Sequence, residues 1–268
     1  MGDLWRVEPG NKKFELDGID TASTEGAPGR KSVTEAALTP LREQLSTLQE
    51  RLWAEHRRSL LVVLQAMDTG GKDGTIRHVF SGVNPLGIRV VSFKAPTPEE
   101  LEHDFLWRIH RAAPCAGEIG IFNRSHYEDV GIVRVHKLVP EKVWRGRYEL
   151  INGFEEQLAH GGTVIVKFFL HISKEEQAER LKARLEDPEK RWKFKKGDLV
   201  ERALWEDYQA AYQKAIRKTS TETAPWYVIP ADHKWYRNWA VMTVVVNTLK
   251  EMDPQVPEPE DLGDVEVV

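Results

Sequence analysis

The feature that most constrains the fold is an apolar stretch, SLLVVLQAM at residues 59–67, which runs directly into the glycine-containing turn DTGGKDG. An unbroken apolar run of this length is typical of a parallel strand buried on both faces. Further stretches of this character follow at 88–93, 118–122, 163–172 and 226–231. Stretches typical of helices precede or separate them at 34–58, 98–112, 140–160, 174–187, 198–219 and 233–251. This alternation predicts an α/β fold, with a mostly parallel five-stranded sheet between two layers of helices.

The turn after the first strand has the chemistry of a phosphate-binding loop. Gly70, Gly71 and Gly74 allow the backbone to turn its N–H groups inward, and the helix that follows offers its positive end to an anion. Lys72 adds a mobile positive charge for phosphate oxygens. With Thr75 in the next turn, these residues are predicted to bind phosphate.

The loop resembles the Walker A motif, G-x-x-x-x-G-K-S/T, but departs from it at two positions. Ala66 stands in place of the first glycine, and Asp73 stands in place of the Ser or Thr that normally holds magnesium. A metal ligand must therefore come from elsewhere, and Asp68 supplies a carboxylate inside the loop.

The third apolar stretch runs into a polar and acidic segment, NRSHYED at residues 123–129. Ligands of parallel α/β sheets bind beyond the carboxyl ends of the strands, where a Walker B motif places carboxylates that hold Mg²⁺. Glu128 and Asp129 are predicted to do so together with Asp68. Arg124 can grip a phosphoryl group through two hydrogen bonds.

A basic segment lies between the fourth and fifth strands, with the sequence KARLEDPEKRWKFKK at residues 182–196. Such a density of positive charge in a chain of net charge −4 indicates a polyanionic ligand. We expect a helical lid at about 182–206 that closes over the crevice and excludes water. The predicted phosphate-binding residues of this lid are Arg184, Lys190 and Lys193.

Other side chains at the same edge of the sheet extend this positive track. Lys94 follows the second strand, and Lys234 and Arg237 follow the fifth. Trp192 and Phe194 alternate with the basic residues of the lid, as aromatic rings do in sites that stack bases. We assign Asn123, Trp192 and Phe194 to the nucleotide.

Taken together, these segments resemble the family-2 polyphosphate kinases. The segments that carry the resemblance are QAMDTGGKDGTIRHVF, GVNPLGIRVVSFKAPT, IFNRSHYEDV, RLEDPEKRWKF and TSTETAPWYVIPADHKWYRNWAV. They lie in order within about residues 35–250, without large gaps. The sequence of residues 122–129, FNRSHYED, resembles that of the family branch that phosphorylates both AMP and ADP.

The resemblance implies a thymidylate-kinase-like P-loop fold and a Mg²⁺-dependent, reversible transfer of the terminal phosphoryl group between inorganic polyphosphate and AMP, ADP or ATP. It places Asp68, Lys72, Arg124, Glu128 and Asp129 in catalysis, with Mg²⁺ on the three acids. It also implies a homo-oligomer, either a dimer or a tetramer.

Composition bounds the remaining expectations. The chain of 268 residues suits an N-terminal arm at 1–33, a kinase core at 34–253 and an acidic, disordered tail at 254–268. A net charge of −4 disfavours a nucleic-acid partner. The single cysteine, Cys115, and the lack of a long apolar run favour a cytoplasmic protein without membrane attachment.

Two other interpretations remain open from the residues alone. An ATP-dependent nucleoside or nucleoside-monophosphate kinase would share the fold but would take its phosphoryl group from ATP. A non-catalytic polyanion-binding protein would share the positive track, although Asp68, Glu128 and Asp129 would repel a polyanion in the absence of a metal.

Overall fold

A computed structural model describes residues 2–260 and contains a six-stranded sheet in the order β1-β6-β5-β2-β4-β3. The strands are β1 Arg6–Val7, β2 Ser59–Ala66, β3 Ile88–Ser92, β4 Ile119–Asn123, β5 Thr163–His171 and β6 Trp226–Pro230. All neighbours pair in parallel except β1, which pairs antiparallel with β6. The predicted parallel strands are therefore confirmed, and the predicted number of five is corrected by β1.

The helices of the described residues vary from one turn to seven. They are α1 Lys31–Glu55, α2 Lys72–Val79, α3 Pro98–Leu101, α4 Trp107–His110, α5 Ile132–Val135, α6 Glu141–His160, α7 Lys174–Glu186, α8 Gly197–Ala203, α9 Trp205–Thr219 and α10 Lys234–Met252. Short 3₁₀ helices are η1 Gly2–Trp5, η2 Leu16–Gly18, η3 Pro85–Gly87, η4 His126–Asp129 and η5 Arg191–Lys193. None of the described helices is long and apolar enough to cross a membrane.

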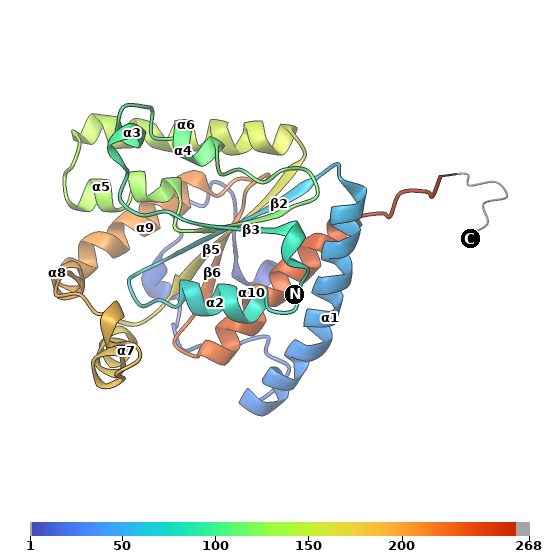
Figure 1. Ribbon diagram of the computed structural model, residues 1–268. Coiled ribbons are helices and arrows are strands. Elements are labelled where there is room, and N and C mark those ends of the chain that lie inside the picture. The colour runs from blue at the N-terminus through green and yellow to red at the C-terminus, as the bar shows by residue number, and fades with distance from the viewer. Residues whose placement is uncertain (1, 261–268) are drawn as a thin grey trace.

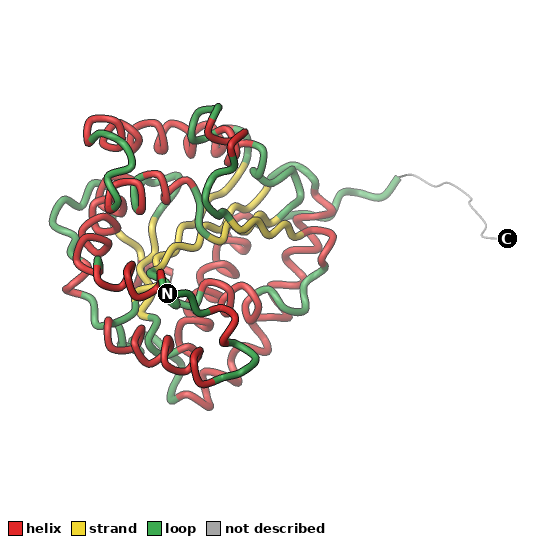
Figure 2. Tube along the Cα trace, turned by 60° about the vertical axis from the view of Figure 1, so that its left-hand side comes forward, coloured by secondary structure: helices red, strands yellow, loops and turns green. Residues whose placement is uncertain are grey.

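Helices cover both faces of the sheet, as predicted (Figure 1). The helices α1, α2 and α10 form one layer, and α5, α6 and α9 form the other. Figure 2 shows the strands enclosed between these two layers. The middle strand β2 is buried along its whole length, because helices cover it on both faces and strands flank it on both edges.

The first residues of the chain lie against the core and supply the sixth strand. Trp5 packs edge-on against Tyr236 and Trp239 of α10, and its indole Nε1 donates a hydrogen bond to the Tyr236 hydroxyl at 3.0 Å. Leu16 is fully buried, and its backbone N–H donates to Gln213 of α9. A two-residue strand has no periodicity, which is why the sequence pattern does not predict β1.

Two predicted helices are interrupted. The expected helix at 98–112 is replaced by α3 and α4, because the Asp104 side chain accepts a hydrogen bond from the Leu106 backbone and closes a local turn in between. The expected helix at 198–219 breaks at Leu204 into α8 and α9. For the predicted disordered tail, residues 261–268 lie outside the described part, and 253–260 contain no helix or strand.

Candidate active site

The loop between β2 and α2 has the conformation that its glycines predict. Gly71 precedes α2 with a left-handed φ of 103°, and a Cβ at this position would collide with the guanidinium of Arg237. Lys72 begins the helix, and its Nζ donates to the carbonyl of Ala66 at 2.9 Å. Thr75 is buried and donates its hydroxyl to the Gly71 carbonyl at 3.1 Å. The first N–H groups of α2 therefore lie at the carboxyl edge of the sheet, where they can bind an anion.

Arg237, a predicted phosphate-binding residue, covers the loop from α10. Its side chain is buried and hydrogen-bonds to the amide oxygen of Asn238, with no carboxylate partner in residues 2–260. Burial and the nearby Arg180 lower the pKa of Arg237 to about 9. A buried arginine without a counter-charge is electrostatically costly, so a bound anion would stabilise it.

Arg180 of α7 completes this cover, and sequence reasoning did not find it. Its guanidinium donates to the backbone carbonyls of Thr69, Ala231 and Asp232 and pairs with Glu176 at 2.7 Å. The signal was a buried face of a helix that follows a strand of the parallel sheet. Arg180 therefore fixes the phosphate loop relative to the segment after β6.

The segment after β4 meets the loop from the other side. Arg124 pairs with Asp68, with 2.9 Å between Nη2 and Oδ1, and its backbone has a left-handed φ of 63°. Glu128 is half-buried beside Arg124 and Lys72, and Gln65 donates to it at 3.0 Å when its side-chain amide is oriented to satisfy its neighbours. The structure therefore brings Asp68, Lys72, Arg124 and Glu128 together.

The electrostatics of this cluster match an anion site. Burial, together with the charge of Arg124, lowers the pKa of Lys72 from 10.5 to about 8, although Asp68 and Glu128 oppose the shift. Burial raises the pKa of Glu128, against the opposing effects of Arg124 and Lys72. Burial therefore disfavours the charged form of both side chains. A bound phosphate would stabilise the charge of Lys72, and a bound cation would stabilise that of Glu128.

Asp129, predicted to hold the metal with Asp68, has other partners. Its carboxylate pairs with Arg147 of α6 at 2.9 Å and lies 4.0 Å from Arg108 of α4. Because the Asp129 side chain is buried against these two arginines, the structure does not bring it into the cluster around Lys72. This pairing cannot be read from the sequence, since both partners are helix residues distant in the chain.

Two further predicted residues lie at the strand ends but bind protein groups. Asn123 ends β4, and its side-chain amide donates to Asp73 at 2.8 Å. Lys94 is exposed after β3, and its backbone carbonyl accepts from Arg108 at 2.9 Å. Lys94 lines a cavity of about 360 Å³ beside Arg89 and Arg111, so a second patch of positive charge lies at the β3 edge.

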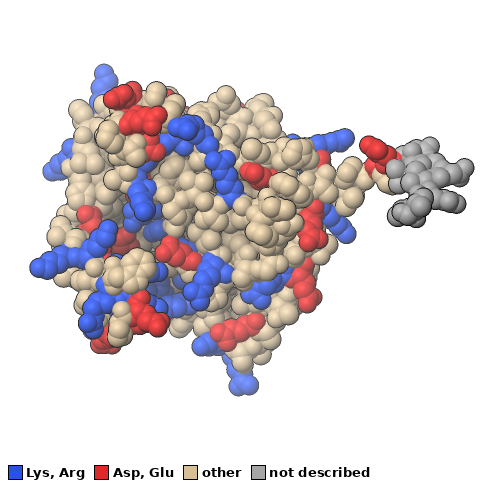
Figure 3. Space-filling model, in the orientation of Figure 1, with Lys and Arg blue, Asp and Glu red and all other residues tan. Residues whose placement is uncertain are grey.

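The predicted lid residues lie on α7, η5 and the turns around them. Lys190 pairs with Asp187, and Lys193 lies 5.2 Å from the ring of Trp192, which is 75% exposed. Arg184 and Phe194 are half-buried. Figure 3 shows Lys and Arg side chains, with acidic ones among them, over the region of α7 and α8.

Lys234, at the start of α10, is surrounded by other cations. Burial lowers its pKa, and the charges of Arg180, Arg237 and Lys190 contribute. Three cations from α7, the following turn and α10 are therefore within electrostatic reach of Lys234, which makes a group of four. This number exceeds what one phosphate group requires and suits a chain of phosphates.

The carboxylates near the phosphate loop can supply only part of the coordination of a Mg²⁺ ion. Among residues 2–260, no three His, Cys, Asp or Glu side chains form a group that could hold an ion. Mg²⁺ commonly takes one or two carboxylates, with water and substrate phosphates in the remaining positions. Asp68 and Glu128 meet this requirement, and the burial that raises the pKa of Glu128 favours a cation beside it.

Residues 29–257 match the family model described as Polyphosphate kinase 2 (PPK2). The chain belongs to the polyphosphate kinase 2 family. The crystal structure of polyphosphate kinase 2 from Arthrobacter aurescens TC1 superimposes with a TM-score of 0.93 at 46% identity, covering 99% of this chain and 93% of that chain. The predicted family, the P-loop α/β fold and the polyphosphate kinase activity are thereby confirmed.

Two relatives differ in the acceptor that their names give. The AMP/ADP-polyphosphate phosphotransferase of Meiothermus ruber is 56% identical over 264 residues, which cover 98% of both chains. The ADP-polyphosphate phosphotransferase of Rhodopseudomonas palustris is 49% identical over 228 residues, covering 81% of this chain and 79% of that protein. Relatives of similar sequence are thus named for different nucleotide acceptors.

Proposed function

We propose that this polyphosphate kinase transfers the terminal phosphoryl group of inorganic polyphosphate to AMP and to ADP, reversibly and with Mg²⁺. The observation that carries the proposal is the set of buried or half-buried cations around the phosphate loop, Lys72, Arg124, Arg180 and Arg237. The acceptor range is supported by the Meiothermus ruber relative, which matches 98% of the chain.

In the proposed reaction, a nucleotide phosphate oxygen forms a bond to the terminal phosphorus, and the bond from that phosphorus to the shortened chain breaks. The transition state spreads negative charge over the transferred oxygens, so positioning and electrostatics supply the catalysis. The attacking oxygen is already anionic, so no strong general base is required. Lys72 and the N–H groups at the start of α2 hold the transferred group, and Arg124 neutralises its charge.

The remaining residues hold the two chains. Arg180 fixes the phosphate loop, and Arg237, which lies over Gly71, would bind the donor, while Lys94, Lys193 and Lys234 guide polyphosphate toward it. Mg²⁺, when bound to Asp68 and Glu128, supplies further charge neutralisation between donor and acceptor phosphates. The nucleotide is assigned to Asn123, Trp192 and Phe194.

We propose that residues 182–206 act as the lid of this site. The base of α7 is tied to the phosphate loop, because Gln177 donates to the Asp68 carbonyl at 2.9 Å and Arg180 donates to Thr69. The tip carries the exposed ring of Trp192 and the exposed basic side chains of Lys193, Lys195 and Lys196. Closure would carry these cations over the phosphates and exclude water that would otherwise hydrolyse the donor.

The test is to incubate the protein with Mg²⁺, polyphosphate and a single nucleotide, AMP or ADP, and to identify the products by chromatography. We expect ADP followed by ATP from AMP, and ATP from ADP. Omitting polyphosphate controls for disproportionation of ADP. Phosphorylation of AMP by ATP, without any product from polyphosphate, would instead identify an ATP-dependent nucleoside-monophosphate kinase.

A further inference from the structure

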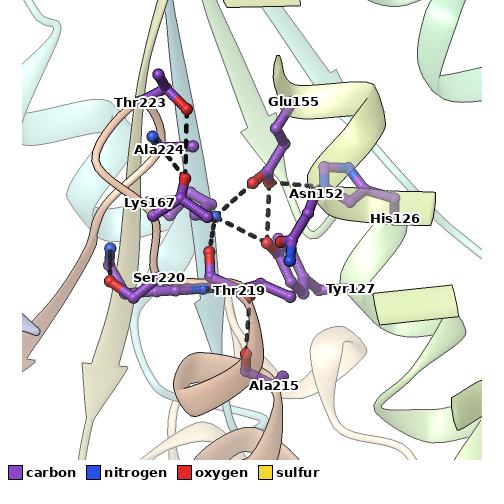
Figure 4. Close-up of polar contacts among 12 residues, drawn as sticks. His126, Tyr127, Asn152, Glu155, Lys167, Ala215, Thr219, Ser220, Thr223 and Ala224 are labelled. Atoms are coloured by element: carbon purple, nitrogen blue, oxygen red, sulfur yellow. Dashed lines mark hydrogen bonds and ion pairs between the residues drawn. The ribbon is translucent and has the colours of Figure 1, made fainter. Parts of the chain in front are cut away.

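A buried charged cluster of Lys167 and Glu155 contacts His126 and Tyr127, which precede Glu128 in the chain (Figure 4). Lys167 lies in the middle of the apolar strand β5, and its Nζ is 2.5 Å from the carboxylate of Glu155 on α6. The two side chains are 0% and 1% exposed. The pair takes no part in the reaction described above.

The pair binds the two residues that precede Glu128 in the chain. The Tyr127 hydroxyl donates to Glu155 Oε1 at 2.9 Å, and the Nε2 of His126 lies 3.1 Å from the same oxygen. The Lys167 ammonium also donates to the Tyr127 hydroxyl at 2.9 Å and to the Thr219 carbonyl at 2.6 Å. One cluster therefore joins η4, α6, β5 and the end of α9.

Stability alone does not explain an ion pair in this place. Removing two charges from water is costly, and apolar side chains of similar size often stabilise a protein as well or better. The residues of β5 on the same face as Lys167, Ile165 and Phe169, are apolar and buried, so a methionine would suit the strand. What an apolar pair could not supply is the set of directed hydrogen bonds to His126 and Tyr127.

Those bonds matter because the backbone just before them is strained. Arg124 has a left-handed φ of 63°, a conformation that persists in a non-glycine residue only where its surroundings hold it. On the strand side, its N–H donates to the Leu64 carbonyl at 3.0 Å. On the other side, the buried cluster holds His126 and Tyr127, so Arg124 is fixed between two anchors and Glu128 directly follows the second.

We propose that Glu155 and Lys167 are positioning residues for phosphoryl transfer, which hold residues 126–127 and thereby aim Arg124 and Glu128 at the phosphate loop. The proposal rests on the proposed function for its kinetic readout. Neither residue touches substrate, so their loss should reduce the rate of the chemical step more than substrate binding.

The test compares the double variant Glu155→Leu/Lys167→Met with Val245→Ala, a core substitution in α10 on the opposite face of the sheet. Thermal unfolding, kcat and KM for polyphosphate and nucleotide are measured, together with backbone hydrogen exchange of residues 124–131 by mass spectrometry. We expect the double variant to fold, with kcat lowered about 30-fold or more, KM values within about threefold, and faster exchange in 124–131. Val245→Ala should lose thermal stability while retaining kcat and the exchange of 124–131.

Two outcomes would overturn the proposal: a folded double variant with kcat within twofold of the parent, or unchanged exchange in 124–131. If the double variant does not fold, Tyr127→Phe and Glu155→Gln replace it, because each alters the directed bonds with little change in volume. We expect each to lower kcat about threefold to tenfold, and unchanged kcat in both would also refute the proposal. The exchange readout is independent of activity, so a parent protein that fails to use polyphosphate refutes the proposed function without deciding the positioning role.

Discussion

Replacing Lys72 with methionine should stabilise the free protein while it destroys activity. Burial is the main cause that lowers the pKa of Lys72 from 10.5 to about 8, so the folded state disfavours the charged ammonium. Each pKa unit corresponds to about 1.4 kcal/mol, so the difference corresponds to about 3 kcal/mol of lost stability. Methionine forfeits the hydrogen bonds of Nζ to the carbonyls of Ala66 and Met67, worth about 0.5–1.5 kcal/mol each once the charge is counted in the pKa. The net gain should be about 0.5–2.5 kcal/mol.

The pH dependence of this gain has a definite sign. The folded protein releases the Lys72 proton at a lower pH than the unfolded chain does. The penalty is therefore fully present below about pH 8 and disappears as the pH rises toward 10.5. The advantage of Lys72→Met over the parent should be largest at pH 7 and should shrink steadily above pH 8.

Thermal and urea unfolding of both proteins between pH 6.5 and 10 measure this difference. For a chain of this size, the gain corresponds to a rise in Tm of about 2–4 °C per kcal/mol at pH 7. Lys250→Met, at an exposed position in the last turn of α10, is the matched control and should change Tm little. Turnover of Lys72→Met should fall about 100-fold to 1,000-fold. A variant less stable than the parent at pH 7, or a gain that does not shrink with pH, would refute the reasoning.

Substitutions elsewhere around the phosphate loop have distinct expected effects. Gly71→Ala should cost about 1–3 kcal/mol of stability and most of the activity, because the new methyl group meets Arg237 and the backbone has a φ of 103°. Chemical denaturation and turnover measure both effects, and a variant with unchanged stability and activity contradicts the prediction. Arg237→Met should raise KM for polyphosphate about tenfold to 100-fold, since it removes charge-assisted hydrogen bonds to the ligand. Initial rates measured against polyphosphate concentration test this, and an unchanged KM would show that Arg237 does not bind polyphosphate. Glu128→Gln should raise the half-saturating Mg²⁺ concentration of the reaction at least about tenfold. Asp129→Asn should leave that concentration within about twofold, because Asp129 pairs with Arg147. A larger effect of Asp129→Asn than of Glu128→Gln would place the metal on Asp129.

Local patterns predicted the parallel strands well, because burial on both faces leaves an unbroken apolar run such as residues 59–66. The glycines and Lys72 predicted the phosphate loop for a similar reason, since close backbone approach to an anion requires particular residue types at neighbouring positions. In both cases the physical requirement is local in the chain. The pairing of β1 with β6 is not local, and nothing in residues 6–7 indicates it.

The contacts of charged side chains were the hardest to predict, because their partners are far away in the sequence. Asp129 sits beside Glu128 in the chain, yet its carboxylate turns to Arg147 and Arg108. Arg180 is an ordinary residue of a charged helix until the fold places it over Thr69 and Ala231. Lys167 interrupts an apolar strand, and its partner Glu155 lies on a helix whose sequence gives no sign of the pairing.

A crystal structure with Mg²⁺, a polyphosphate of defined length and a non-reactive ADP analogue would show directly whether the phosphate loop binds the donor. We expect phosphate oxygens within about 3 Å of Lys72 Nζ, the N–H groups at the start of α2 and the Arg124 guanidinium, with the chain continuing toward Lys234. Phosphates bound only in the basic cavity at the β3 edge, lined by Arg89, Lys94 and Arg111, with none at the loop, would contradict it.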